Sequence, residues 1–297
     1  MLRERWLPRC LQPQAKLSCR QVGSSISNST CSWVRLHSVK AGDAHVDIDF
    51  QCTKCGQCCR DLWLPLSVQE ALRWMEDGNA VNVLCEAIPW PSELPASNRQ
   101  AAFKRERSFS ATSGTLAIRV LVTLAAPLGG RCPNLLADNL CGIYERRPVV
   151  CRLYPANANP FLEFVPQQRR CPPDAWQVVE SPLMRSGEYI NGELRLLIRA
   201  RQERSVEDVP VHEALCKELG IREAAMANEG FVVHAPDTLE MLSALRMAID
   251  RTLSALQDWE FISDSAATVE AIRSCDAECS FASQHLGEFD YLSSSAS

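Results

Sequence analysis

Four cysteines within eight residues constrain this chain more than any other feature of its sequence. Residues 50–60 read Phe-Gln-Cys-Thr-Lys-Cys-Gly-Gln-Cys-Cys-Arg, which gives Cys52, Cys55, Cys58 and Cys59. Two sulfurs bound to one tetrahedral metal at about 2.3 Å lie roughly 3.7 Å apart, and a tight C-x-x-C turn supplies that separation. Gly56 follows Cys55 and can take the left-handed conformation that such a turn often needs, so that backbone N–H groups point at the thiolates. The cluster therefore predicts a metal site.

The adjacent pair Cys58 and Cys59 is harder to place on one ion. Neighbouring side chains diverge on an extended backbone, so the pair favours two metal centres or one polynuclear cluster. The spacing is similar to the ferredoxin run C-x₂-C-x₂-C-x₃-C-P. Here the fourth cysteine follows at once and no proline comes next, so an ordinary ferredoxin is a poor match.

A second set of cysteines is spread over forty residues and consists of Cys132, Cys141, Cys151 and Cys171. Together the two sets supply eight thiols, which fits two four-coordinate sites, or one iron–sulfur cluster and one zinc ion. Four thiolates on a divalent ion carry a formal charge of about −2, which nearby cations would stabilise. The arginines placed in sequence to do so are Arg60, Arg146, Arg147 and Arg152.

The histidines and the remaining cysteines contribute little to this prediction. None of the five histidines lies within or between the two cysteine sets, so the site is expected to be all-thiolate. Cys275 and Cys279 are four residues apart and could share one helix face, but no further ligand lies near them. Cys85 and Cys216 are expected to be core or loop cysteines.

Composition indicates the compartment and excludes some partners. The chain has 15 cysteines and no apolar run near its start that would serve as a secretory signal, which favours a reducing, cytoplasmic location. A net charge of −5 provides no basic field for nucleic acid. The longest apolar stretch, Leu116 to Leu128, is too short for a bilayer and contains Arg119, so no membrane partner is expected.

Residues 1–43 differ in composition from the rest. Between residues 5 and 42 there is no Asp or Glu, while Arg, Lys, Ser and Gln are frequent. This is typical of a transit peptide, or of a disordered or non-native extension. We favour the extension because Pro8 and Pro13 interrupt any helix. Cys10, Cys19 and Cys31 lie there and receive no role.

Periodicity predicts a mixed α+β fold. Alternation predicts strands at Val46–Phe50 and 116–124, and Ser67 with Glu70 forms a capping-box start for a helix over Val68–Met75. The Pro-rich residues 85–98 are expected to be loop. Helices are predicted from Pro210 to Leu219 and from Asp237 through Leu256. We therefore expect a small, loop-rich domain organised around metal at 44–180, a mainly helical segment at 181–260 and a C-terminal tail at 261–297.

The cysteine motifs resemble the YkgJ-like cysteine-cluster family, whose members are described as zinc- or iron-chelating. Its first motif, F-x-C-x-x-C-x-x-C-C, corresponds to residues 50–59. Its second, C-x-I-Y-x-x-R-P-x-x-C-R-x-Y-P, corresponds to residues 141–155, and Cys132 and Cys171 stand where the other family cysteines are expected. The likeness covers about residues 46–180 and implies a metal centre of zinc or iron, a 4Fe–4S cluster included.

Three functions remain open. The chain could be a metal-binding module that stores or senses metal or carries electrons. Some members of the family carry the label flagellin lysine N-methylase, which would imply an iron–sulfur enzyme using S-adenosylmethionine, although no nucleotide-binding Gly-rich turn is present. The third alternative is a structural zinc protein that binds a partner protein. Thiolates suit both zinc and iron, so spacing alone does not separate them.

Overall fold

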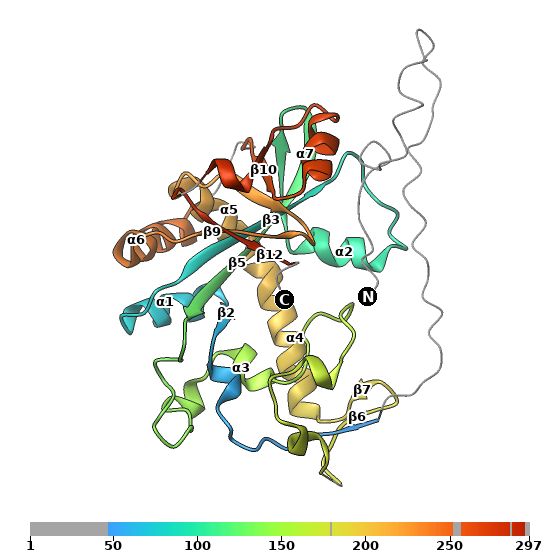
Figure 1. Cartoon of the computed structure of the whole chain (residues 1–297), viewed down its shortest axis with the longest axis vertical. Helices are drawn as coiled ribbons and strands as arrows, with labels where there is room; N and C mark the ends of the chain where they lie inside the picture. Colours follow the sequence, from blue (N-terminus) through green and yellow to red (C-terminus); the bar gives the residue numbers. More distant parts are fainter. Residues whose placement is uncertain (1–46, 179, 252–256, 286, 295–297) are drawn as a thin grey trace. The chain divides into compact units, whose positions relative to one another are not determined.

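The structure is a computed structural model that describes residues 47–178, 180–251, 257–285 and 287–294 (Figure 1). The predictions made for residues 1–43 lie outside this part of the chain. The described residues belong to two compact units that interleave along the sequence. Unit 1 takes its described residues from Asn82–Thr123 and Val209–Ser297, and unit 2 takes its own from Ser38–Val81 and Leu124–Asp208.

Unit 1 is built on a mixed sheet. Its parallel strands lie in the order β11-β10-β8-β3, and β3 is followed in the sheet by β5. The strand β4 pairs antiparallel with β5, while β9 pairs antiparallel with both β3 and β12. The bounds are β3 Asn82–Pro89, β4 Phe109–Ser113, β5 Leu116–Leu128, β8 Glu223–Met226, β9 Gly230–His234, β10 Glu260–Ser263, β11 Cys279–Phe281 and β12 Asp290–Ser293.

Four helices accompany this sheet, and the three from the C-terminal part of unit 1 are amphipathic. α5, α6 and α7 bury apolar side chains such as Leu215, Leu245 and Ile272. The helices are α2 Arg99–Glu106, α5 Val209–Glu218, α6 Thr238–Ile249 and α7 Ala266–Arg273. The predicted α5 is confirmed, and so is the start of α6 with Asp237 as its cap. α6 ends at Ile249, short of the predicted Leu256, and residues 252–256 lie outside the described residues.

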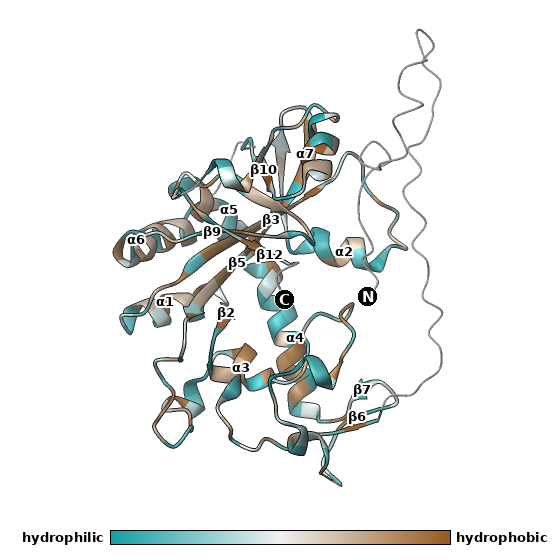
Figure 2. Cartoon of the chain, viewed as in Figure 1, coloured by the Kyte–Doolittle hydropathy of each residue, from teal (hydrophilic) through white to brown (hydrophobic). Residues whose placement is uncertain are grey.

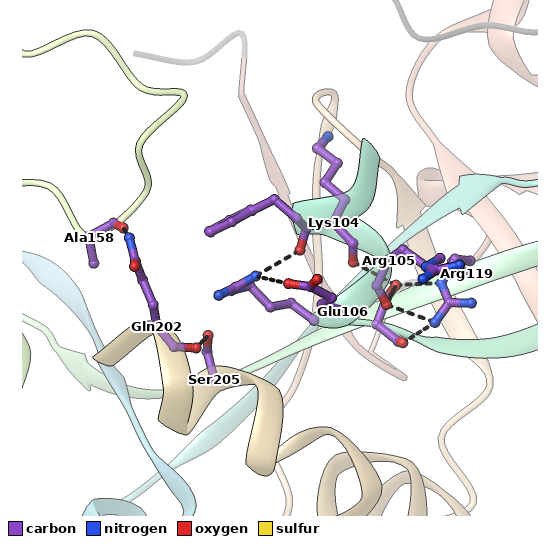
Figure 3. Close-up of polar contacts among 10 residues, drawn as sticks. Lys104, Arg105, Glu106, Arg119, Ala158, Gln202 and Ser205 are labelled. Atoms are coloured by element: carbon purple, nitrogen blue, oxygen red, sulfur yellow. Dashed lines mark hydrogen bonds and ion pairs between the residues drawn. The ribbon is translucent and has the colours of Figure 1, made fainter. Parts of the chain in front are cut away.

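Arg119 lies within the apolar strand β5, and its guanidinium donates several hydrogen bonds to neighbouring residues. Its guanidinium donates to Ser108 Oγ at 2.7 Å and to the Arg105 carbonyl oxygen at 2.8 Å, which ties the end of α2 to the sheet (Figure 3). It also donates to Ser110 Oγ at 3.0 Å. A cation is tolerated in this strand because side-chain and backbone acceptors surround it.

The strand predicted at 116–124 is confirmed, and it continues to Leu128 as part of β5. The loop predicted at 85–98 is wrong over its first residues, since β3 extends to Pro89. β3 is buried at seven of its eight positions, so its sequence shows no alternation of apolar and polar residues. Figure 2 shows β3 coloured hydrophobic over much of its length. Cys85 lies in this strand and Cys216 in α5, and both are core residues as expected.

Unit 2 consists of short elements joined by long irregular segments. β1 pairs antiparallel with β6, and β6 with β7. β2 pairs antiparallel with residues 124–128, the last five of β5. The bounds are β1 Ile48–Asp49, β2 Leu62–Leu66, α1 Val68–Glu76, α3 Val149–Leu153, β6 Pro182–Arg185, β7 Glu188–Tyr189 and α4 Gly192–Glu207, with short 3₁₀ turns at Gln57–Cys59, Tyr144–Arg146, Pro166–Gln168 and Pro173–Trp176.

Helix α1 begins where the sequence predicts. Ser67 Oγ accepts from the backbone N–H of Glu70, and the Glu70 carboxylate accepts in return from the backbone N–H of Ser67. Of the strand predicted at Val46–Phe50, the structure has Ile48–Asp49 as β1, and Val46 lies outside the described residues. Helix α4 buries no residue completely, and Gln202 on this helix donates to the Ala158 carbonyl oxygen at 2.7 Å (Figure 3).

The mixed α and β content is confirmed, but the fold is neither small nor mainly helical after residue 180. Strands β6 to β12 all lie there, and the segment 261–297, expected as a tail, contributes α7, β11 and β12. β8 explains the error: its Glu-Ala-Ala-Met sequence favours helix, yet sheet pairing on both sides holds it extended. Cys275 follows α7 while Cys279 lies in β11, so they share no helix face.

Within the residues that the structure describes, no helix is both long enough and apolar enough to cross a bilayer.

Candidate metal centre

The first cysteine segment folds as a tight turn in unit 2. Gly56 has φ +71°, the left-handed conformation predicted for it, and starts the 3₁₀ turn at 57–59. A side chain at this position would be strained, and its Cβ would lie 3.1 Å from Asn139 Cβ. The backbone N–H of Lys54 points at Cys52 Sγ, with nitrogen and sulfur 3.4 Å apart. The expected orientation of an N–H group toward a cysteine sulfur is therefore present here.

Cys58 and Cys59 do not diverge, contrary to the expectation from an extended backbone. The 3₁₀ turn brings their sulfurs to 4.0 Å, close to the roughly 3.7 Å of two thiolates on one tetrahedral ion. A hydrogen bond from the Cys59 thiol lowers the pKa of Cys58 to about 7, and the same interaction raises the pKa of Cys59. Near neutral pH the pair therefore tends to carry one proton and one negative charge.

Cys132 and Cys141 are brought to this turn by backbone hydrogen bonds. The N–H of Cys132 donates to the carbonyl oxygen of Cys59 at 2.8 Å, which joins the two cysteine segments directly. The loop after Cys132 then closes on itself, since Leu135 and Cys141 form a β-bridge and Gly142 N–H donates to the Asn134 carbonyl oxygen at 2.8 Å. Cys132 is buried and Cys141 is half-buried.

Cys151 lies in the short helix α3, whose start is fixed by a residue of α1. The backbone N–H of Val149 donates to Glu70 Oε1 at 2.6 Å, while Glu70 Oε2 completes the capping box of its own helix. Burial, together with smaller contributions from the charges of Cys132, Cys58 and Cys141, raises the pKa of Cys151 to about 12. Cys151 thus lies within electrostatic reach of three other cysteines of the two sets.

Cys171 is held beside the first turn through Tyr154 and Arg170. The Arg170 N–H donates to Tyr154 Oη at 2.8 Å, and the Arg170 guanidinium donates to the carbonyl oxygens of Arg60 at 2.8 Å and Asp61 at 2.7 Å. Burial, together with smaller contributions from the charges of Cys58, Cys55 and Cys52, raises the pKa of Cys171 to about 11. A hydrogen bond with Tyr154 lowers it.

All eight cysteines named from the sequence therefore lie in unit 2, in two neighbourhoods that overlap at Cys58. The first neighbourhood joins Cys171 to Cys52, Cys55 and Cys58. The second joins the Cys58–Cys59 pair to Cys132, Cys141 and Cys151. Four segments that are distant in sequence contribute to this group of thiols.

One of the four arginines expected to offset thiolate charge lies in position to do so. Arg147 lowers the pKa of both Cys58 and Cys151 through its charge, and its guanidinium stacks on Tyr144 at 3.6 Å from the ring centroid. Arg60 donates to Asn139 Oδ1, and Arg152 pairs with Glu193 at 3.4 Å. The bridging role of Arg170 was missed, because nothing in its local sequence shows that it reaches residues 60 and 61.

The donor set fits a metal that prefers sulfur, although the thiols are not in a closed coordination sphere. Among the described residues, no three His, Cys, Asp or Glu side chains are arranged to hold one ion as they stand. The twelve described cysteines are all free thiols, and the described histidines, 212, 234 and 285, belong to unit 1. Soft thiolates suit zinc and iron–sulfur clusters. Binding would require the sulfurs to lose their protons and draw together.

Comparison with known proteins gives a family for this segment. Neither the curated proteins nor the solved structures include a match to the chain. Residues 51–172, which contain all eight cysteines of the two sets, match the model of the CxxCxxCC family, described as "Putative zinc- or iron-chelating domain". The resemblance drawn from the cysteine motifs is therefore confirmed over residues 51–172, the segment that matches this family model.

Proposed function

We propose that this chain is a thiolate metal-binding protein that uses the eight cysteines of unit 2 for metal handling or for redox chemistry. The observation that carries the proposal is that distant cysteine segments are joined to the first cysteine turn, the Cys132 segment through the hydrogen bond to Cys59 and the Cys171 segment through the Arg170 bridge. Core cysteines would need no such links and would be surrounded by apolar side chains. A reducing compartment such as the cytoplasm suits a protein that depends on free thiols.

The ligands we propose are Cys52, Cys55, Cys58, Cys59, Cys132, Cys141, Cys151 and Cys171. A bound zinc ion would supply folding free energy, whereas an iron–sulfur cluster would supply electron transfer. The chain's own contribution is to offset thiolate charge, which Arg147 and the Lys54 N–H support. Cys52 is exposed while Cys132 is buried, so an ion would approach from the Cys52 side.

The deciding experiment is metal analysis with an absorption spectrum on protein purified without oxygen. Iron with acid-labile sulfide and a broad band near roughly 400 nm would identify an iron–sulfur protein. Colourless protein with one or two zinc ions per chain would identify a zinc protein. Protein that retains neither metal, even after incubation with zinc or after cluster reconstitution, would contradict the proposal.

Single substitutions then test the ligand set. Cys55→Ser and Cys151→Ser should each lower bound metal and increase proteolysis, because each removes a thiolate from a different segment. Cys275→Ser is the matched control: this half-buried cysteine belongs to unit 1 and should leave metal content unchanged. Full metal content in both test variants would exclude Cys55 and Cys151 as ligands.

A second candidate, a structural zinc protein that binds a partner protein, is favoured by one specific observation. The loop between Cys132 and Cys151 exposes Leu136, Leu140 and Tyr144, which are 48%, 41% and 58% exposed. Exposed apolar side chains close to one another often mark a surface for protein contact. Under this alternative, zinc would exchange very slowly with a competing chelator, whereas a metal-handling protein would release its zinc to the chelator readily.

A further inference from the structure

A second group of polar side chains lies in unit 1, where the parallel strand β11 ends. β11 is an edge strand of the mixed sheet and pairs in parallel with β10. Ser280 is the middle residue of β11, and His285 and Glu288 lie in the segment that follows it. The sequence separations of five and three residues match no motif, and these residues received no role from the sequence.

The three side chains form a continuous hydrogen-bonded chain. Ser280 Oγ lies 2.7 Å from His285 Nε2, and His285 Nδ1 lies 2.9 Å from Glu288 Oε2. The neutral tautomer that donates Nδ1–H to the carboxylate leaves Nε2 free to accept the serine hydrogen. A serine, a histidine base and a carboxylate that orients the base are the parts of a nucleophilic triad.

The imidazole is also held by packing. Its ring stacks on Phe289 with centroids 5.1 Å apart and an interplanar angle of 24°, which fixes the plane in which Nε2 points at Ser280. Phe289 in turn packs on the apolar cluster of Ala225, Val232 and Ile262, and its ring centroid lies 5.7 Å from that of His234. Positioning of the base by both a carboxylate and an aromatic ring goes beyond what a simple turn contact requires.

The solvent exposure of these three side chains limits which molecules could react with Ser280. Ser280 is 8% exposed, and the side chains of His285 and Glu288 are 19% and 69% exposed. A nearly buried hydroxyl next to apolar side chains suits a small substrate with a short apolar acyl group rather than a large or charged one. The exposed Glu288 is expected to contribute less than a buried carboxylate would, because solvent screens its charge.

We propose that Ser280, His285 and Glu288 form a hydrolytic site for small carboxylic esters. Ser280 Oγ attacks the ester carbonyl carbon while its proton passes to His285 Nε2, and the same proton then leaves with the alcohol. Water attacks the acyl-serine in a second step, again giving its proton to Nε2, which returns the proton to Ser280 as the carboxylic acid departs. Glu288 is a positioning residue that keeps the imidazole in the required tautomer.

The test uses the full chain and a small alkyl fluorophosphonate, which forms an oxygen–phosphorus bond at an activated serine and releases fluoride. The expected result is one adduct per chain, mapped to Ser280 by peptide mass spectrometry. His285→Ala should slow labelling by about 100-fold or more, the range for loss of a general base. Glu288→Gln should slow it by a smaller factor. Ser280→Ala should abolish the adduct without changing the melting temperature.

Ser283→Ala is the matched control, because Ser283 is an exposed serine of the same segment and should label like the parent. p-Nitrophenyl acetate provides a second readout: the parent should release a burst of nitrophenol equal to one per chain, and Ser280→Ala should not. If Ser280 stays unlabelled in folded parent protein, or if His285→Ala labels as fast as the parent, the contacts serve only to close the turn and the proposal is overturned.

Discussion

The two units bury their side chains to very different extents. Unit 1 contains most of the largest fully buried side chains, among them Trp259, Phe261, Leu215 and Met241. Unit 2 also buries apolar side chains around β2, α1 and residues 124–128, such as Leu66 and Leu124, but its group around β1 and β6 has only Ile48, Leu183 and Met184 as buried members. Hydrophobic burial is the main favourable term in folding. Unit 1 is thus stabilised by its sheet and helices, whereas the cysteine segments of unit 2 lack a comparable core.

The cysteine segments themselves have few buried apolar side chains, such as Leu135 and Leu153, and polar contacts help to hold the elements of unit 2 together. Glu70 joins α1 to α3, Arg170 joins the segment after the first turn to Cys171, and the buried Asp208 accepts from the N–H of Val68 at 3.0 Å. Each such bond contributes about 1 kcal/mol, less than burial of a large apolar side chain. A bound metal should therefore add more to the stability of unit 2 than to that of unit 1.

The largest effect is expected from removal of metal, which tests whether unit 2 depends on metal more than unit 1 does. A chelator should remove most amide protection from residues 47–62 and 130–176 and leave β3, β8 and β10 protected, as measured by hydrogen exchange with mass spectrometry. Structural zinc contributes an apparent 10–16 kcal/mol in zinc-finger peptides, so the loss should be large. Equal loss of protection in β8 and β10 would show that the two units do not differ in their dependence on metal.

The opposite perturbation is Phe261→Ala in unit 1. Phe261 is completely buried in β10, and removal of a buried phenylalanine costs about 3–5 kcal/mol. We expect faster hydrogen exchange in β8, β10 and β11 with unchanged metal content. Loss of metal in this variant would mean that the cysteine segments depend on the core of unit 1. Phe161→Ala, an exposed phenylalanine of unit 2, is the control and should change neither quantity.

Protons compete with metal for the cysteine sulfurs of unit 2, so metal affinity should depend on pH. Burial raises the pKa of Cys151 to about 12 and of Cys171 to about 11, so both thiols hold their protons near neutral pH and metal must displace them. Each displaced proton makes affinity rise about tenfold per pH unit, so these two thiols predict about 100-fold between pH 7 and pH 8. Competition titrations with a chromophoric chelator measure this slope. Affinity independent of pH would contradict the assignment of these two ligands.

The smallest effect is expected from Glu70→Ala. This change removes the capping box of α1 and the acceptor for Val149 N–H, which should cost about 1–2 kcal/mol. Because α3 carries Cys151, metal affinity should fall as well. Glu76→Ala, at the last residue of the same helix, is the control, and its metal affinity should remain at the parent value. Equal metal affinity in the two variants would show that the start of α3 needs no anchor.

Local patterns predicted local structure well. The left-handed Gly56, the Ser67–Glu70 capping box and the alternation of β5 each depend on residues close together in sequence, and each was predicted. The uniformly apolar β3 and the helix-favouring sequence of β8 were missed because pairing between strands, not local propensity, holds them extended. The C-terminal part of unit 1 was consequently expected to be helical.

The candidate site was likewise predicted where it depends on local sequence and missed where it depends on distant contacts. Its cysteines were identified by spacing, and the structure brings them into one unit. The contacts that assemble them join residues 79 and 110 positions apart, as in Glu70 with Val149 and Arg170 with Arg60, and no sequence pattern encodes such pairs. The approach of Cys58 to Cys59 was missed because it depends on a 3₁₀ turn in place of the extended backbone that was assumed.

The interleaving of the two units also sets an order of events during synthesis. All eight cysteines of unit 2 have been made once the ribosome reaches residue 171, whereas β8, β10 and β11 of unit 1 are completed only at residue 281. At about 5–20 residues per second, those 110 residues take roughly 5–20 s. During that interval the nascent chain presents its thiols before its main sheet can form. The metal supply of the cell at that moment, and not only the affinity of the finished protein, would then select the ion that is bound.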